Sequence, residues 1–176
     1  MGFGAKQGFP PWTPGFAGGA LVIPNPGWET GGAGGWTLTP GSSGGVCAVS
    51  AVDPRSGIYH LLLTKAGAGS QSYAYVDLGT YNSIPGLIGQ RIRFSVYGKA
   101  VGTPTTDLQL QITYIGSAQG ATTVTFTLAD NGGVYKLHSV TSVAIPSDTT
   151  NIRLFVATSS GGGGSWRVDD MTLELL

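Results

Sequence analysis

The residues that could carry out acid–base chemistry are few in this sequence and lie far apart along it. His60 and His138 are the two side chains that could act as a base near neutral pH without a shifted pKa. Each stands alone in a strand-like run, which favours a structural role. Glu29 with Asp169 or Asp170 could form a hydrolytic pair only if folding brought them together. No nucleophile elbow, phosphate-binding loop or HExxH motif occurs, so we expect no enzyme.

The same three carboxylates, Glu29, Asp169 and Asp170, suit a calcium ion better than catalysis. Calcium binds about six to eight oxygens in flexible geometry, often from two carboxylates together with backbone carbonyls and water. The alternative is that these carboxylates accept backbone N–H hydrogen bonds and stabilise turns. Composition favours neither interpretation over the other.

Aromatic side chains are candidates for a second kind of chemistry, stacking on the faces of sugar rings. Tyr73 and Tyr75 share one face of a strand-like segment, Tyr97 lies among polar residues, and Trp36 follows a glycine-rich turn. Aromatic residues are common in sheets in any case, so packing at a core or an edge explains each of them as well. The sequence shows no regular strip of aromatic residues.

The first 19 residues combine glycine, proline and large aromatic side chains. Their prolines oppose helix and favour extended backbone. Disordered tails are usually poor in large aromatics. We therefore expect residues 1–19 to form an extended arm that anchors on a partner protein or on its own domain. The anchoring residues of this arm are Phe3, Phe9, Trp12 and Phe16.

The elements that must position these residues are β-strands, because apolar and polar residues alternate in segment after segment between turn signals. In one of them, 107–116, leucine and isoleucine alternate with glutamine. About ten short strands in one domain predict an all-β fold, a jelly-roll β-sandwich over residues 20–176. The predicted strands are 20–23, 46–52, 57–65, 72–78, 90–100, 107–116, 122–128, 134–145, 151–158 and 165–175.

The last predicted strand, 165–175, changes its alternation part-way. Apolar residues occupy even positions up to Val168 and odd positions from Met171 onward. A β-bulge near Asp169 and Asp170 accounts for the shift and brings both carboxylates toward the same side of the strand. Bulges often re-aim functional side chains, so this is the strongest local indication of a site.

The N-terminal segment contains Asn25-Pro26-Gly27-Trp28-Glu29 followed by Gly35-Trp36, and the last predicted strand contains Trp166-Arg167-Val168-Asp169-Asp170-Met171. These two motifs resemble the N-terminal signature and the closing strand of the family 4/9-type carbohydrate-binding modules. The runs 57–65 and 90–99 also resemble its strand order, so the resemblance covers about residues 21–176. Trp28 stands where the family usually has Phe, and Met171 where it has Val. The resemblance implies a jelly-roll sandwich and a structural calcium ion near Glu29 and Asp169, with Asp170 beside them.

Charge and composition exclude several classes of protein. Nine Lys and Arg balance nine Asp and Glu, so no long-range field attracts nucleic acid. No run of about 18 apolar residues is present, so we expect no membrane span. The hydrophobic share of 41% predicts a buried core despite 30 glycines and 10 prolines.

The expected location and function follow from these features together. A single cysteine, Cys47, and no Sec-type signal indicate a protein made in a reducing cytosol. We predict a non-enzymatic structural protein of a larger assembly, most simply a phage virion component (a capsid decoration or cement, head-fibre or tail protein) held to other subunits by its arm. The alternative is a carbohydrate-binding module that recognises a polysaccharide or cell-surface glycan, located outside the cell if exported.

Overall fold

The computed structural model describes residues 21–67, 69–127, 133–159 and 162–176, and within them ten strands form two five-stranded sheets. The first sheet has the order β1-β4-β9-β6-β7 and the second has the order β2-β3-β10-β5-β8. The strands are β1 (Thr37–Thr39), β2 (Val46–Ser50), β3 (His60–Lys65), β4 (Tyr73–Asp77), β5 (Ile92–Val101), β6 (Leu108–Ile115), β7 (Ala121–Phe126), β8 (Lys136–Thr141), β9 (Asn151–Thr158) and β10 (Gly164–Leu175).

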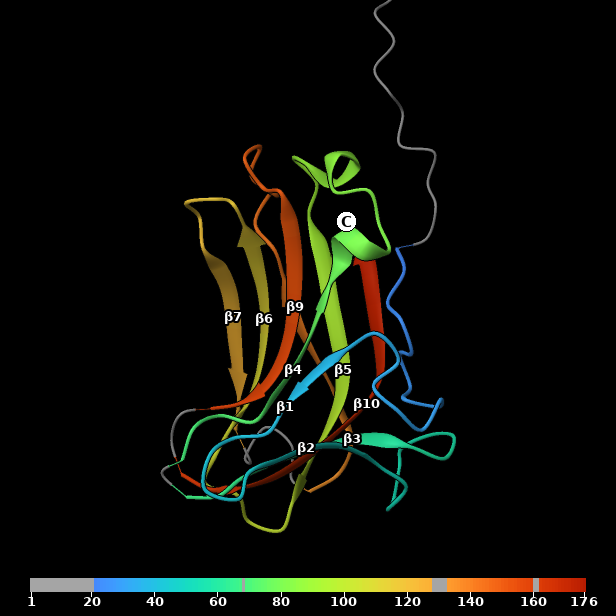
Figure 1. Cartoon of the computed structure of the whole chain (residues 1–176), viewed down its shortest axis with the longest axis vertical. Helices are drawn as coiled ribbons and strands as arrows, with labels where there is room; N and C mark the ends of the chain where they lie inside the picture. Colours follow the sequence, from blue (N-terminus) through green and yellow to red (C-terminus); the bar gives the residue numbers. More distant parts are fainter. Residues whose placement is uncertain (1–20, 68, 128–132, 160–161) are drawn as a thin grey trace, which may run out of the picture.

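Every strand pair among the described residues is antiparallel, and strands that are adjacent in a sheet are mostly distant in sequence. Figure 1 shows β7, β6 and β9 side by side in one part of the molecule and β5 beside β10 in the other. The predicted all-β jelly-roll sandwich is confirmed. The two faces that pack together follow the predicted alternation.

The core between the sheets is built from alternate residues of each strand. Ile92, Phe94 and Val96 of β5 are fully buried, as are Ile152 and Leu154 of β9. Their neighbours in the chain point away from the core, and all of them except the buried Ser95 are more exposed. Because side chains alternate across a strand, one face of each sheet packs in the core and the other face points outward.

Three tryptophans, Trp28, Trp36 and Trp166, belong to the same buried core as these residues. Trp28 and Trp36 have ring centroids 5.4 Å apart, and Trp36 also lies 6.5 Å from Phe94. Trp36 Nε1 donates to the Pro24 carbonyl at 2.9 Å, and Trp166 Nε1 donates to the Thr106 carbonyl at 2.9 Å. Both indoles thus bury their area without losing their hydrogen bond.

The strand prediction was wrong at the start of the chain and missed a strand nearby. Residues 21–23 of the predicted strand 20–23 form no strand; Val22 instead bonds to the side chain of Asn82 through both its N–H and its carbonyl. Residue 20 lies outside the described residues. The missed strand is β1, which has only three residues, and an alternation that short is not distinguishable from a loop.

Strand β3 begins later than its predicted range of 57–65. Gly57 has a φ of 57°, which is outside the extended region. The N–H groups of Ile58 and Tyr59 donate to the carboxylate of Glu29, at 2.9 and 3.3 Å, rather than to a neighbouring strand. The strand can begin only where its backbone bonds to β2, at His60.

The bulge predicted in the last strand is confirmed. The register of β10 against β5 shifts between Asp169 and Thr172, and Asp170 adopts a φ of 44°. The N–H of Met171 donates to the Pro26 carbonyl at 2.9 Å. This hydrogen bond connects the bulge to the loop that precedes β1.

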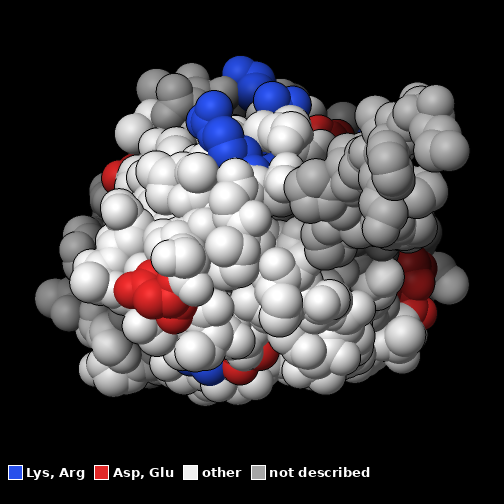
Figure 2. Space-filling model, turned by 90° about the horizontal axis from the view of Figure 1, so that it is seen from above, with Lys and Arg blue, Asp and Glu red and all other residues white. Residues whose placement is uncertain are grey.

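Two short 3-10 helices, η1 (Leu78–Thr80) and η2 (Pro85–Leu87), lie in the connection from β4 to β5, near the upper end of Figure 1. Figure 2 views the molecule from that end and shows a surface formed mostly by uncharged residues, with small separate groups of charge. Among the described residues, no helix has the length and apolar character that crossing a membrane requires.

Candidate binding face on the first sheet

The outer face of the first sheet presents rings on one half and amides on the other. Tyr73 and Tyr75 alternate with buried residues on β4, and Phe155 does so on β9. The register places Tyr75 opposite Phe155 and Phe155 opposite Gln111 of β6. Side chains from three strands that are distant in sequence thus share one surface. Two of them, Tyr73 and Tyr75, were predicted as candidates for binding glycan.

The three rings form one compact apolar cluster. The ring centroid of Tyr73 lies 6.3 Å from that of Tyr75 and 5.8 Å from that of Phe155, and the Tyr75 and Phe155 centroids are 5.5 Å apart. These spacings fall in the range of favourable aromatic contacts, about 4.5–7 Å. Each residue is only half-buried, so the cluster offers apolar surface to solvent while being held in place by its own contacts.

The amides beside the rings are oriented by hydrogen bonds. Gln71 Nε2 donates to Gln109 Oε1 at 2.9 Å, and Gln111 Nε2 donates to Thr123 Oγ1 at 2.8 Å. A primary amide has two N–H donors and an oxygen with two lone pairs. After these bonds each glutamine therefore retains hydrogen-bonding capacity in an orientation that the neighbouring strand sets.

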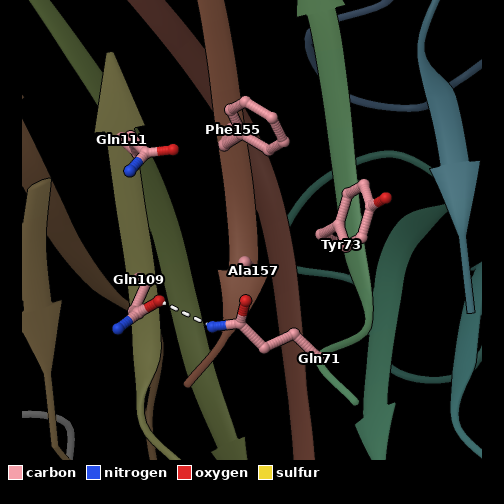
Figure 3. Close-up of a pocket in the computed structure, with 6 residues that line it drawn as sticks. All are labelled: Gln71, Tyr73, Gln109, Gln111, Phe155 and Ala157. Carbon is pink, nitrogen blue, oxygen red and sulfur yellow. Dashed lines mark hydrogen bonds between the residues drawn. The ribbon is translucent and has the colours of Figure 1, made fainter. Parts of the chain in front are cut away.

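A shallow hollow of about 130 Å³ lies between the rings and the amides. Figure 3 shows the two aromatic rings on one side of it, the glutamines of β6 on the other, and the Gln71–Gln109 hydrogen bond along one end. Its lining residues are Gln71, Tyr73, Gln109, Gln111, Phe155 and Ala157. Pockets that enclose small molecules are larger, about 300–1,000 Å³, so a ligand would lie across this face rather than inside it.

Charge is almost absent from this face. The five strands of the first sheet carry two charged residues, Asp77 and Arg153, and these bond to each other twice, Nε to Oδ1 at 2.6 Å and Nη2 to Oδ2 at 2.8 Å. Donating hydrogen bonds to Asp77 raises the pKa of the Arg153 guanidinium further above its usual value. The guanidinium also lies 4.1 Å from the ring centre of Tyr75. The pair therefore borders the aromatic cluster directly.

The outer face of the second sheet is different, because the loop 51–59 is fixed to it by charge. Asp53 pairs with Lys99 of β5 at 2.8 Å and with Arg167 of β10. The hydrogen bond from Lys99 is the largest cause that lowers the pKa of Asp53. Tyr135 donates from its hydroxyl to the Asp53 carbonyl at 3.1 Å. Arg55 lies 3.4 Å from the ring centre of Tyr97, so that ring face is occupied within the protein.

Two of the predicted glycan-binding aromatics do not belong to the face described above. Trp36 is 4% exposed and packs in the core, so its prediction as a sugar platform was wrong; the glycine-rich turn before it aims the ring inward. Tyr97 lies on the second sheet under Arg55, away from Tyr73 and Tyr75. The predicted arm residues Phe3, Phe9, Trp12 and Phe16 lie outside the described residues.

The three residues predicted as metal ligands lie around Gly27, without their oxygens forming one ligand set. A Cβ placed on Gly27 would lie 3.6 Å from Asp170 Oδ1, 3.9 Å from Asp169 Oδ1 and 3.5 Å from Glu29 Cγ. Asp169 is fully buried, and burial is the main cause that raises the pKa of its carboxyl. The bulge thus positions both aspartates as the sequence predicted.

The oxygens of these carboxylates are already hydrogen-bonded. Asp169 Oδ2 accepts from the N–H groups of Arg55 and Ser56, at 2.9 and 3.2 Å. Asp170 pairs with the Arg55 guanidinium and accepts from the Ser56 hydroxyl at 2.7 Å. Among the described residues, no group of three or more His, Cys, Asp or Glu has a metal-binding arrangement. As arranged, these residues fit the turn-stabilising alternative rather than a metal ion, and calcium stays a prediction of the resemblance.

Neither histidine lies on the glycan-binding candidate face. His60 is fully buried at the start of β3, and its two ring nitrogens have no partner among the described residues. Burial lowers the pKa of His60 to about 4. His138 is buried on β8 with its ring centroid 4.4 Å from that of Phe126. Both therefore occupy structural positions.

Sequence reasoning missed Phe155, the glutamines and the Arg153–Asp77 pair as parts of one site. A usable signal was present, because all of them except Gln71, which precedes β4, occupy the outward positions of alternating strands. What the alternation cannot supply is the order β4-β9-β6, which places them side by side.

Comparison with solved structures identifies this architecture. A family 61 carbohydrate-binding module in complex with β-1,4-galactotriose aligns with a TM-score of 0.58 at 19% identity over 89% of this chain and 99% of that one. A family 22 xylan-binding domain from Paenibacillus barcinonensis aligns with a TM-score of 0.63 at 16% identity over 90% and 96%. The fold is that of a carbohydrate-binding module. At these identities the likeness concerns the fold alone.

A second kind of protein shares the fold. The enzymatically active domain of tailspike protein 4 of bacteriophage CBA120 aligns with a TM-score of 0.65 at 14% identity, over 89% of this chain and 21% of the tailspike chain. This chain therefore spans about a fifth of the length of that tailspike chain. The sequence matches no protein-family model and no curated protein sequence.

Proposed function

We propose that this chain is a non-catalytic carbohydrate-binding domain and that its site is the shallow hollow on the outer face of the first sheet. The observation that carries the proposal is the cluster of Tyr73, Tyr75 and Phe155 beside the hydrogen-bonded amides of Gln71, Gln109 and Gln111. The fold shared with carbohydrate-binding modules supports it.

The chemistry of this face suits a sugar on both of its sides. The C–H faces of a sugar ring are apolar and pack on aromatic rings, whereas its hydroxyl groups both donate and accept hydrogen bonds. The glutamine amides can donate hydrogen bonds to sugar hydroxyls through their N–H groups and accept hydrogen bonds from them through their oxygens. Aromatic faces also stack on nucleobases, but nucleic acid needs cationic groups for its phosphates, and the cation of this face is paired with Asp77.

The test is a binding screen of the full-length chain against plant, bacterial and cell-surface polysaccharides. We expect a defined subset to bind. Tyr73→Ala and Phe155→Ala should each weaken binding by about tenfold or more, since aromatic anchors contribute about 2 kcal/mol or more where they dominate a contact. Tyr97→Ala is the matched control, because it removes a half-buried strand tyrosine from the other sheet.

Two results would contradict the proposal. One is the absence of binding across the whole screen with folded protein. The other is an equal loss of binding in Tyr97→Ala and Phe155→Ala, which would place the site elsewhere.

A place in a phage particle is the second candidate, and the specific observation for it is the tailspike domain with the same fold. In this version the sandwich is a virion component (capsid decoration, head-fibre or tail protein) that other subunits hold through residues 1–19. Glycan binding on the first sheet and attachment through the arm use different parts of the chain, so the two candidates are compatible.

A further inference from the structure

The charged pair at the border of the site stands apart from the other charges of the strands. The strands of the second sheet carry eight charged residues, whereas those of the first carry Asp77 and Arg153 alone. Both side chains are 30% exposed, so solvent and ligand can reach them. The guanidinium lies 4.1 Å from the ring centre of Tyr75 and 5.9 Å from that of Phe155.

The geometry of the pair neutralises the cation in place. Arginine keeps its charge at all physiological pH values and binds carboxylates in a fork. Asp77 occupies that fork with both of its oxygens. A ligand carboxylate that approached Arg153 would meet a guanidinium already paired with Asp77. It would lose its hydration without gaining an unpaired cation to bind.

We propose that Asp77 is a specificity-determining residue that restricts this site to neutral glycans by holding Arg153 as a closed pair. This inference rests on the proposed function and deepens it by naming the ligand class. Glycans that bear carboxylates in the bound segment are rejected. Removing the Asp77 charge releases the guanidinium and converts the site to one that accepts them.

The experiment uses one neutral polysaccharide that binds the wild-type chain and the same polysaccharide after oxidation of its primary hydroxyls to carboxylates. Wild type should bind the oxidised form at least about tenfold more weakly. Asp77→Asn should regain binding to the oxidised form by about tenfold, which is the scale of a hydrogen bond to a charged group. The regained binding should fall in 0.5 M salt, because exposed charges are screened there.

Two controls separate this effect from a general change in charge. Glu174→Gln removes the partner of Arg93 in an exposed pair on the second sheet, so it changes the net charge equally and should gain nothing. The double variant Asp77→Asn with Arg153→Gln should lose the gain. Asp77→Ser removes the same charge and replaces Asp77→Asn if that variant does not fold.

The inference is overturned if wild type binds the neutral and oxidised forms equally. It is also overturned if the folded Asp77 variants gain no binding to the oxidised form, or if Glu174→Gln gains as much. Failure of the proposed function looks different, because in that case wild type binds no neutral polysaccharide at all.

Discussion

The residues of the candidate site offer two kinds of interaction, apolar contact and hydrogen bonding. Tyr73, Tyr75 and Phe155 offer apolar area without direction, whereas Gln109 and Gln111 offer directional bonds. A ligand must present an apolar face and a hydroxylated edge at the same time to use both. This requirement describes a sugar ring better than a purely apolar molecule or a polyanion.

His60 makes the stability of the domain depend on pH. Its pKa is about 4 in the folded protein, mainly because burial disfavours the charged ring, against about 6.5 in an unfolded chain. Between these values the unfolded state binds more protons, so the free energy of unfolding falls as pH falls. We expect His60 to contribute a loss of about 3 kcal/mol between pH 7 and pH 4.

Chemical denaturation at pH 7 and pH 4 measures this loss. Replacing the unpartnered ring in His60→Leu should make the difference between the two pH values smaller than in wild type. An equal difference in both proteins would show that other groups cause the acid sensitivity.

Gly57 should be sensitive to the addition of a single methyl group. It has a φ of 57° and its added Cβ would overlap the carboxylate of Glu29, which two backbone N–H groups hold in place. Gly57→Ala should lower the free energy of unfolding in urea by at least about 1–2 kcal/mol, the cost of the left-handed region alone. Gly27→Ala is the control, because its Cβ has ordinary contacts of 3.5 Å or more; an equal loss in both would contradict this reason.

At the scale of elements, the β10 bulge and the loop 51–59 form one unit. The bulge turns Asp169 and Asp170 toward the loop. In the loop, two backbone N–H groups donate to Asp169, and the Arg55 guanidinium pairs with Asp170. This contact closes the outer face of the second sheet near Tyr97. The first sheet has no comparable covering charge network on its described strands, which leaves its rings and amides accessible.

Calcium is tested at this unit by thermal unfolding with excess CaCl2 and with EDTA. Because the carboxylates already bond to N–H groups and Arg55, we expect the same melting temperature in both samples. An ion that binds only the folded state raises the melting temperature. A higher value in CaCl2 would therefore show that the ion implied by the resemblance binds and that the hydrogen bonds described above give way to it.

Most of the strands and the bulge could be predicted from the sequence, because alternation and its interruption are local signals. The start of β3 could not, because it depends on Glu29 accepting hydrogen bonds from residues 29 and 30 positions away. The candidate site could be predicted only in part for the same reason, because it depends on contacts between residues that are distant in sequence. Tyr73 and Tyr75 share a face by local alternation, whereas Phe155 and Gln111 join them only through the order of strands.

At the scale of the whole molecule, the two sheets differ in the charge that their strands carry. The second sheet holds most of the strand charges and binds its own loop, whereas the first is nearly uncharged and exposes a hollow. Under the proposed function, the first sheet binds the ligand, while the second holds the loop 51–59.

Deleting residues 1–19 tests the separation between the arm and the sandwich. We expect the shortened chain to keep its melting temperature and its affinity for polysaccharide, because the described residues from 21 onward already form a core and line the hollow. Circular dichroism and a binding assay measure both quantities. Loss of glycan binding on deletion, with folding intact, would assign the arm a part in the site.

The most direct test of the central claim is a map of chemical-shift changes in the full-length, isotope-labelled chain during titration with an oligosaccharide from the polysaccharide that binds best. We predict that the changes centre on β4, β6 and β9, with Tyr73, Gln109, Gln111 and Phe155 among the most affected. Changes centred on the second sheet around Tyr97, or no changes with any oligosaccharide tested, would contradict a carbohydrate-binding site on the first sheet.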